Sequence, residues 1–412
     1  MGDAVQSAEE RAHFAQVLRA WDEYLPYALS VNQARRKALC NLPLAHQTML
    51  RALSTPLPAP TLGEPVPDTK GGVRARLAEM DDRIRRNADV LAQVADFCRD
   101  FLGILDADDV EETDDAEAND VEVDDGEVDD AHAVDTNEDT HTNHTVSEGD
   151  QDRIRTALRQ MVRDWSAEGR EERDAAYAPI LTALVQRIPP NRTVRVLVPG
   201  AGLGRLAFDL AAQGYSVQGN EFSYFMLIPS HFLLNNTQRV RQHVVYPYIH
   251  SVSNWVTAAD LLRGVAIPDV LPSSLAPGTD FSMVAGEFVE VYAKPEERNA
   301  WNCVATCYFL DTAKNALRYI EVINALLPVG GLWINVGPLL WHFEHDAHTP
   351  SLELTLDEIL ALLPQLGFVV EELHMLPAQS YTGSAHSMLA HQYRPVFWVC
   401  RKVEEHAMAP AV

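Results

Sequence analysis

The chain of 412 residues lacks the features that would place it in a membrane or outside the cell. No apolar run is long enough to cross a bilayer. The first 16 residues are charged and contain no apolar signal core, so we expect no export. The five cysteines are odd in number and form no CxxC pair, which favours free thiols in a reducing compartment. We therefore expect a cytoplasmic protein, with a nuclear location left open, and no membrane partner.

Outside one acidic segment, the chain also lacks a strong excess of charge of either sign. The formal net charge is −26, from 59 acidic and 33 basic residues. Twenty of the acidic residues, and no Lys or Arg, lie between Asp106 and Asp150, which leaves 39 acidic residues against 33 basic ones elsewhere. A protein that binds the phosphate backbone needs a basic surface. We therefore expect no nucleic-acid partner.

Composition divides the chain into four segments. Residues 1–104 carry apolar side chains at helical spacing and predict an N-terminal helical region. Residues 105–150 should form a disordered acidic linker, because they cannot bury enough apolar surface to offset chain entropy. The histidines of this linker are more typical of a solvated segment than of a metal site, and we expect no metal. Residues 151–402 should form the main domain, followed by a short tail at 403–412.

The main domain has the alternating pattern of a doubly wound α/β sheet of the Rossmann type. Strand-like runs lie at 194–198, 215–219, 281–284, 302–309, 332–336, 368–376 and 395–400. Helical stretches between them include 205–213, 312–327 and 355–363. The last two strand-like runs have no good helix between them, so we expect one of the two to run antiparallel at the sheet edge.

A glycine-rich turn follows the first predicted strand. It contains Gly200, Gly202 and Gly204, whose lack of a side chain lets the backbone approach a ligand at a helix N-terminus. Glu221 follows the next strand, where a carboxylate can accept both hydroxyls of a ribose. A dinucleotide-binding turn needs glycine at position 205, which is Arg205 here. The spacing therefore favours S-adenosylmethionine over NAD, with a purely structural tight turn as the alternative.

Six stretches of the chain form a distinctive ordered set. They are VRDWS at 162–166, VLVPGAGLGRL at 196–206, QGNEFSYFML at 218–227, MVAGEF at 283–288, ATCYFLDTA at 305–313 and INVGPLLWHF at 334–343. Over roughly residues 151–402 the set resembles the carnosine N-methyltransferase family. The resemblance implies a class I methyltransferase fold that uses S-adenosylmethionine. It also implies methylation of an imidazole nitrogen in carnosine, which gives anserine, or in a related histidyl peptide.

The resemblance assigns one group of residues to the methionine and ribose parts of the cofactor. Gln160 and Arg163 lie three residues apart on the helix before the sheet and would reach the methionine end. Arg163 would meet the carboxylate there. Gly200 and Gly202 would contact the methionyl backbone, and Glu221 the ribose. Without the resemblance, a solvated helix face would be the more common explanation for the first pair.

A second group would complete the cofactor site. Glu287 and Phe288 end the third strand, where a polar group and a ring can hold adenine. The family usually has Asp where this chain has Glu287. Cys303 and Cys307 share one strand face, and one of them would line the pocket. Core packing is the alternative for Phe288 and for both cysteines.

Three residues at the predicted carboxyl edge of the sheet are the catalytic candidates. Asp311 follows the fourth strand, and we expect it to stabilise the imidazolium that forms during transfer. The alternative is an N-cap for a helix beginning at Thr312. His342 follows the fifth strand, and Tyr393 precedes the last strand, where it could donate its hydroxyl to the substrate. Structural roles for these two residues are the alternatives.

The sequence leaves two further functional hypotheses open. The acceptor could be a protein histidine instead of a small histidyl dipeptide. The chain could also be a cofactor-binding module without catalysis, although Asp311, His342 and Tyr393 argue against that. Neither hypothesis changes the expected fold, and a homodimer stays open as an assembly.

Overall fold

The computed structural model describes residues 8–52, 72–102, 147–346 and 348–408. The predicted acidic linker therefore lies outside the described residues except at its end. There the structure differs from the prediction, because helix α5 (Glu148–Trp165) begins inside the predicted linker. Ser147 accepts a hydrogen bond from the Asp150 backbone N–H at 3.1 Å and caps this helix. The acidic side chains of the first turn also suit the positive end of the helix dipole.

The sheet has seven strands in the order β5-β2-β1-β6-β7-β9-β8. Their bounds are β1 (Arg195–Pro199), β2 (Ser216–Glu221), β5 (Phe281–Ala285), β6 (Cys303–Cys307), β7 (Leu332–Gly337), β8 (Phe368–Met375) and β9 (Val396–Lys402). The strands from β5 to β7 are parallel. Order and direction confirm the doubly wound, Rossmann-like class I sheet expected from the alternating pattern.

The prediction of an antiparallel strand at the edge was wrong in position. The antiparallel strand is β9, which lies inside the sheet between β7 and β8. Its first five residues are all buried, whereas β8 is buried only at its first residue and carries charged side chains. A strand covered on both faces tolerates a continuous apolar run, and charged side chains protect an open edge from pairing with another chain.

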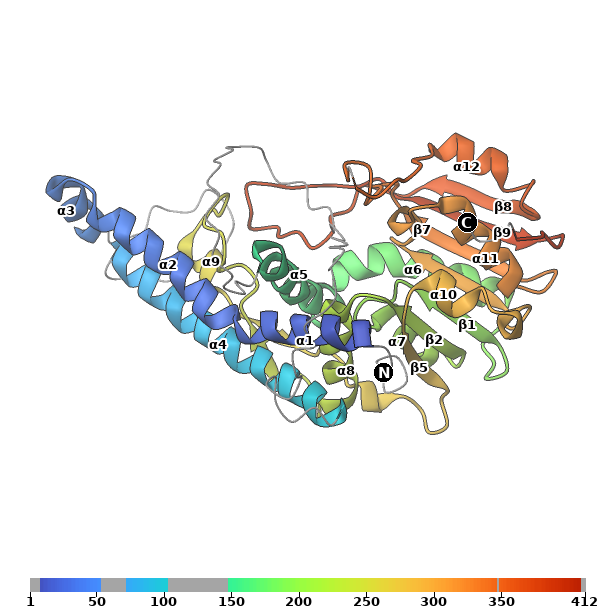
Figure 1. Ribbon diagram of the computed structural model, residues 1–412, viewed down its shortest axis with the longest axis horizontal. Helices are drawn as coiled ribbons and strands as arrows, with labels where there is room; N and C mark the ends of the chain where they lie inside the picture. The colour runs from blue at the N-terminus through green and yellow to red at the C-terminus, as the bar shows by residue number, and fades with distance from the viewer. Residues whose placement is uncertain (1–7, 53–71, 103–146, 347, 409–412) are drawn as a thin grey trace.

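Helices cover both faces of the sheet (Figure 1). The side chains of Val196 and Val198 in β1 pack toward α6 (Arg170–Arg187) and α7 (Arg205–Ala212), and Leu197 between them packs toward the opposite face. That face is covered by α10 (Phe288–Tyr292), α11 (Ala316–Leu326) and α12 (Leu356–Leu362). A capping box formed by Thr355 and Glu358 begins α12. The result is a three-layer arrangement with the carboxyl ends of the parallel strands at one edge.

The N-terminal region is helical in the described residues. It consists of α1 (Ala8–Asp22), α2 (Tyr24–Cys40), α3 (Leu44–Ala52) and α4 (Gly72–Leu102). In Figure 1, α2 and α4 run side by side and extend away from the sheet. Phe14 and Trp21 are buried in one apolar cluster with α5 and α8 (Tyr224–Asn236). These helices therefore share a core with the main domain.

Two short strands and a short helix contact α4 and α5. The strands β3 (His243–Val245) and β4 (Val265–Ile267) pair antiparallel, and α9 (Ala258–Leu262) lies between them in the chain. This small sheet was not predicted from the sequence, because three-residue strands carry too little periodicity to be recognised. Leu261 and Leu262 of α9 pack against the N-terminal helices.

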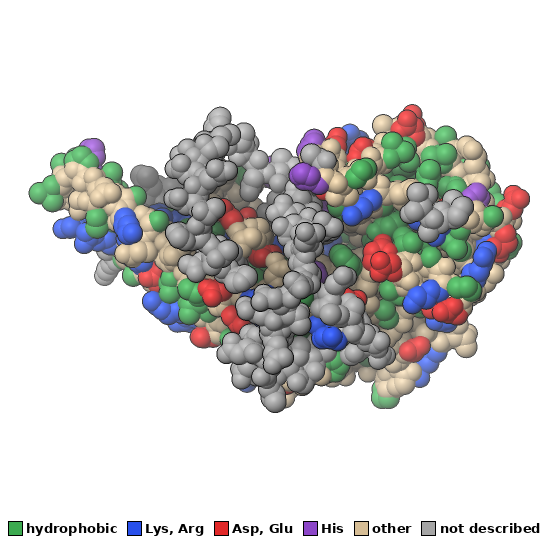
Figure 2. Space-filling model, in the orientation of Figure 1, with side chains coloured by type: hydrophobic (Ala, Val, Ile, Leu, Met, Phe, Trp, Pro, Cys, Tyr) green, Lys and Arg blue, Asp and Glu red, His purple; other side chains and the backbone are tan. Residues whose placement is uncertain are grey.

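The described part of the chain contains no helix long and apolar enough to cross a membrane. Within the same ranges, no group of three His, Cys, Asp or Glu side chains is arranged to hold a metal ion. Acidic and basic side chains are interspersed over the face shown in Figure 2, including the edge near β8 and β9. Ion pairs there join Arg187 to Glu371 and Glu372.

Candidate active site

The glycine-rich turn joins β1 to α7 in a conformation that requires glycine. Gly200 and Gly202 have positive φ angles of 64° and 52°. A Cβ at Gly200 would come within 2.6 Å of the Phe309 ring, so both the backbone angle and the space exclude a side chain there. The Glu221 carboxylate accepts the Gly202 N–H at 2.8 Å. It also accepts the N–H groups of residues 222 and 223, each at 2.9 Å. Glu221 thus holds the turn against the end of β2.

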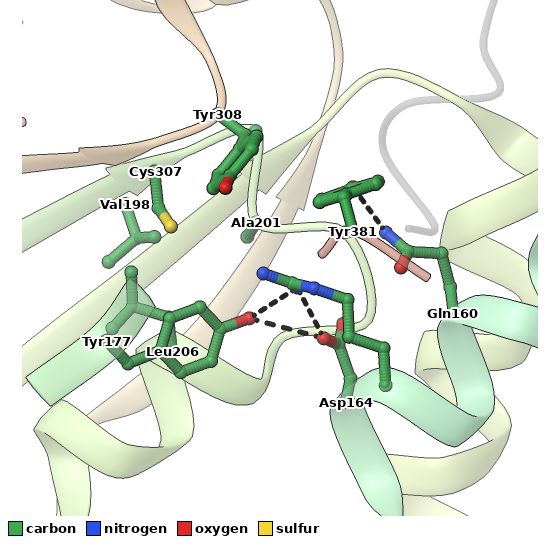
Figure 3. Close-up of a pocket in the computed structure, with 12 residues that line it drawn as sticks. Gln160, Asp164, Tyr177, Val198, Ala201, Leu206, Cys307, Tyr308 and Tyr381 are labelled. Atoms are coloured by element: carbon green, nitrogen blue, oxygen red, sulfur yellow. Dashed lines mark hydrogen bonds and ion pairs between the residues drawn. The ribbon is translucent and has the colours of Figure 1, made fainter. Parts of the chain in front are cut away.

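A pocket lies beside this turn, as Figure 3 shows. It is lined by Gln160, Arg163, Asp164, Tyr177, Val198, Gly200, Ala201, Gly202, Leu206, Cys307, Tyr308 and Tyr381. Five of the predicted cofactor contacts are brought together here, from α5, the glycine turn and the end of β6. The lining also contains three tyrosines that the sequence analysis did not identify.

Arg163 lies in this pocket with only 6% of its side chain exposed. Its Nη1 donates to Asp164 Oδ1 at 2.9 Å and to the Tyr177 hydroxyl at 3.0 Å. Its Nε lies 2.8 Å from Glu172 Oε1. The guanidinium also faces the Tyr381 ring, 4.8 Å from its centroid. The guanidinium is therefore fixed in place, with aromatic and acidic groups around it.

Gln160 provides a test of what the pocket can hold. Its Nε2 donates to the Tyr381 hydroxyl at 2.8 Å. Its Oε1 is buried and has no hydrogen-bond partner among the described residues. A buried acceptor without a donor is costly, so the pocket fits a ligand that brings one. An ammonium beside a carboxylate, as in the methionine part of S-adenosylmethionine, would satisfy Gln160 and Arg163 together.

The two residues predicted to hold adenine, Glu287 and Phe288, have different surroundings in the structure. Glu287 caps α10 by accepting the Glu290 N–H at 2.8 Å, and burial raises the pKa of its carboxyl group. The Phe288 side chain is 2% exposed and contacts Phe309 and Tyr319 edge to face. The ring of Phe288 therefore packs in the core behind the sheet edge, as the alternative interpretation held.

The two cysteines of β6 also differ in their surroundings. Cys307 ends the strand and lines the pocket, and burial raises the pKa of its thiol to about 12, so that it stays neutral. Cys303 begins the strand and is fully buried in the apolar cluster beneath α6. Because β6 meets the pocket only at its carboxyl end, the assignment of Cys303 to the cofactor is corrected to core packing.

The three catalytic candidates lie at the same edge of the sheet. Asp311 is 3% exposed, and its Oδ2 accepts the Leu340 N–H at 2.9 Å. Its backbone oxygen accepts the His342 N–H at 3.1 Å. Burial raises the pKa of Asp311 to about 6, with His342 and the Leu340 N–H opposing part of the rise. Burial, and to a lesser degree the charge of Asp311, raises the pKa of the Tyr393 hydroxyl.

The helix-cap alternative for Asp311 is wrong. Helix α11 begins at Ala316, four residues later than predicted, and its N-cap is Asn315, which accepts the Arg318 N–H at 3.2 Å. Asp311 belongs to a separate 3₁₀ turn at Leu310–Thr312. Its carboxylate is thus held by the loop after β7 and is not used to start a helix.

Tyr308 connects the pocket with this second group of residues. Its ring lies 4.9 Å from that of Tyr381 and 6.3 Å from that of Tyr393, measured between centroids. Its φ of 54° is unusual for a bulky residue, and such strain is found mostly at functional sites. The residue falls within the family-like stretch 305–313, which was the available signal. Tyr381 lies in a loop without periodicity and gave no signal.

Comparison with known proteins gives consistent results. A family model described as carnosine N-methyltransferase matches residues 140–404. The carnosine N-methyltransferase of Schizosaccharomyces pombe is 36% identical over 412 residues, which cover 95% of this chain and 96% of that one. The Mus musculus carnosine N-methyltransferase is 46% identical over 257 residues, which cover 61% of this chain and 64% of that one. A Drosophila melanogaster relative of the same description is 41% identical over 254 residues, covering 61% and 55%.

Proposed function

Because this chain belongs to the carnosine N-methyltransferase family, we propose that its acceptor is the imidazole ring of carnosine or of a closely related histidyl dipeptide. The chain is an S-adenosylmethionine-dependent N-methyltransferase. The main structural support for this acceptor is the buried carboxylate of Asp311, which lies at the same sheet edge as the cofactor pocket. An imidazole has a second nitrogen that such a carboxylate can bind.

The pocket beside the glycine turn would hold the cofactor. Gln160 and Arg163 would bind its methionine end. Glu221, which borders the glycine turn, would bind the hydroxyls of its ribose. The bound cofactor supplies a methyl group on a sulfonium. The neutral thiol of Cys307 and the ring of Tyr308 would keep water from the transfer path, which favours attack by the intended nucleophile.

Asp311 would select the reactive form of the acceptor ring. With a pKa of about 6 it is ionised at neutral pH and accepts the N–H of the far imidazole nitrogen. The near nitrogen then presents its lone pair toward the methyl group. As the new N–C bond forms, the S–C bond to the methyl group would break and its electron pair would stay on sulfur, leaving a neutral thioether. The ring becomes cationic, and the adjacent carboxylate stabilises that charge. The far nitrogen can then release its proton to Asp311, which leaves a neutral methylated product.

The loop after β7 would orient the Asp311 carboxylate, and the neutral Tyr393 would help to bind the acceptor. The Leu340 N–H orients one carboxylate oxygen, and the backbone bond from His342 fixes the turn that carries it. The raised pKa of Tyr393 keeps its hydroxyl protonated, so it can donate to the acceptor.

The test is incubation of the full-length protein with S-adenosylmethionine and carnosine, followed by mass spectrometry. We expect a gain of one methyl group on the imidazole ring. A panel of histidyl peptides and a protein bearing exposed histidines serves as comparison. Methylation of the protein histidines with no product from carnosine would reject the proposed acceptor.

A further inference from the structure

Residues 377–394, here called the strap, connect β8 to β9 and cover one side of the pocket. In Figure 1 the strap leaves the sheet and passes above α5. Tyr381 is its contribution to the pocket, through the hydrogen bond with Gln160 and the contact with the Arg163 guanidinium. A ligand at the methionine end of the pocket must therefore fit beneath the strap.

One buried carboxylate on α6 joins the strap to the cofactor-binding side of the pocket. Glu172 Oε1 accepts the Thr382 backbone N–H at 2.9 Å and lies 2.8 Å from Arg163 Nε. Its other oxygen accepts the Ser380 hydroxyl at 3.4 Å. Only 13% of the Glu172 side chain is exposed. The same side chain thus binds residues on both sides of Tyr381 and the arginine beneath it.

The far end of the strap is held by backbone contacts and also by side-chain contacts to α9 and the arginine that follows it. The Met388 N–H donates to the Asn254 oxygen at 2.6 Å, and Ser387 forms a β-bridge with Trp255. Near the tip of the strap, Met388 and Leu389 are 69% and 46% exposed. At the pocket end, Arg163 contacts the Tyr381 ring, and Glu172 is a buried carboxylate that contacts both Arg163 and the strap backbone.

We propose that Glu172 is a positioning residue that couples closure of the strap to occupation of the cofactor pocket. The inference rests on the proposed contact between Arg163 and the cofactor. A cofactor carboxylate bound to Arg163 would hold the guanidinium in the orientation in which its Nε faces Glu172. Glu172 in turn holds Thr382 and keeps Tyr381 over the ligand. Coupling of this kind is reciprocal, so strap closure also strengthens cofactor binding.

Limited chymotrypsin digestion of the full-length protein tests the coupling, with cleavage at the exposed strap tip followed by mass spectrometry of the fragments. The cofactor product S-adenosylhomocysteine is added at a concentration that saturates each variant. It should slow cleavage of the wild type by roughly tenfold, since cleavage follows the open population. In Glu172→Gln, which keeps an acceptor for Thr382 but removes the charge that pairs with Arg163, we expect less than about threefold protection. The exposed neighbour Glu171→Gln is the matched control and should behave as the wild type.

Arg163→Lys tests the same link from the other side and keeps the experiment decisive if Glu172→Gln does not fold. It retains the positive charge but loses the Nε geometry, so protection at saturation should fall as in Glu172→Gln. Wild-type protection in either folded variant, or an equal loss in Glu171→Gln, would overturn the coupling. If Arg163→Lys needs no more S-adenosylhomocysteine for saturation than the wild type, the proposed cofactor contact fails instead. The measurement requires no methyl acceptor and is independent of the carnosine assay.

Discussion

The glycine turn and the strap border the same pocket, but they are stabilised over very different distances along the chain. Glu221 holds the Gly202 N–H across 19 residues of sequence. Glu172 holds the Thr382 N–H across 210 residues. The turn is therefore built mainly from neighbouring segments with a recognisable spacing, whereas the strap depends on an irregular loop meeting a distant helix. This difference explains why the turn could be predicted from the sequence and the position of the strap could not.

The acceptor side of the pocket should show the largest effect of a single substitution. Asp311→Asn preserves the shape and can still accept the Leu340 N–H, but it removes the charge opposite the developing imidazolium. We expect kcat to fall by roughly 10²–10³, the scale for one such electrostatic group. Single-turnover kinetics with carnosine measures the rate, and calorimetry should show nearly unchanged cofactor affinity. A rate close to that of the wild type would remove Asp311 from the mechanism.

The turn side should show its largest effect in cofactor binding. Glu221→Ala removes the expected ribose contact together with three backbone partners, and should weaken cofactor affinity by about 2–3 kcal/mol. Glu221→Gln is the control, because it keeps one oxygen acceptor and loses the charge. Calorimetric titration with S-adenosylhomocysteine would decide the matter. Equal affinity in Glu221→Ala and the wild type would contradict a ribose contact.

The raised pKa of Asp311 also predicts a pH-dependent gain in stability for Asp311→Asn. Burial moves its pKa from 3.8 to about 6, so folding disfavours the ionised form. The resulting cost is absent below about pH 3.8, grows as the pH rises toward 6, and is complete above it. Asp311→Asn should therefore be more stable than the wild type at pH 8 by on the order of 3 kcal/mol, since one pKa unit corresponds to about 1.4 kcal/mol. Urea unfolding at pH 8 and pH 4 should show this gain only at the higher pH.

We expect the smallest effect on activity from deleting the acidic segment. Because Ser147 caps α5, the deletion should end at residue 146. Deleting residues 106–146 should change kcat/KM by less than about tenfold, since composition predicts that this segment adds no core. Deleting 106–150 also removes Ser147, which caps α5, and the first turn of that helix. This longer deletion should cost about 1 kcal/mol of stability in addition. Equal melting temperatures for both deletions would contradict a contribution from the cap.

The predicted cofactor residues fall into two groups for physical reasons. Gln160, Arg163 and Cys307 reached the pocket because helix and strand periodicity fixes which side chains share a face. Cys303 shares the face of Cys307 but lies at the other end of the strand, where the pocket does not extend. A periodic pattern specifies a face, and it does not say how far along an element the ligand lies. Glu172 was missed because a carboxylate on an amphipathic helix is ordinarily solvated.

The α/β order of elements, the glycine turn and the class of cofactor could be predicted from the sequence, because these depend on periodicity and on residues close in the chain. Tertiary structure alone decided that β9 enters the sheet between β7 and β8, and that Asn315 instead of Asp311 starts helix α11. It also decided that Tyr381 comes to lie over Arg163. Such contacts join segments that local patterns treat as independent. Their free energy comes from burial and charge pairing, which exist only after the chain has folded.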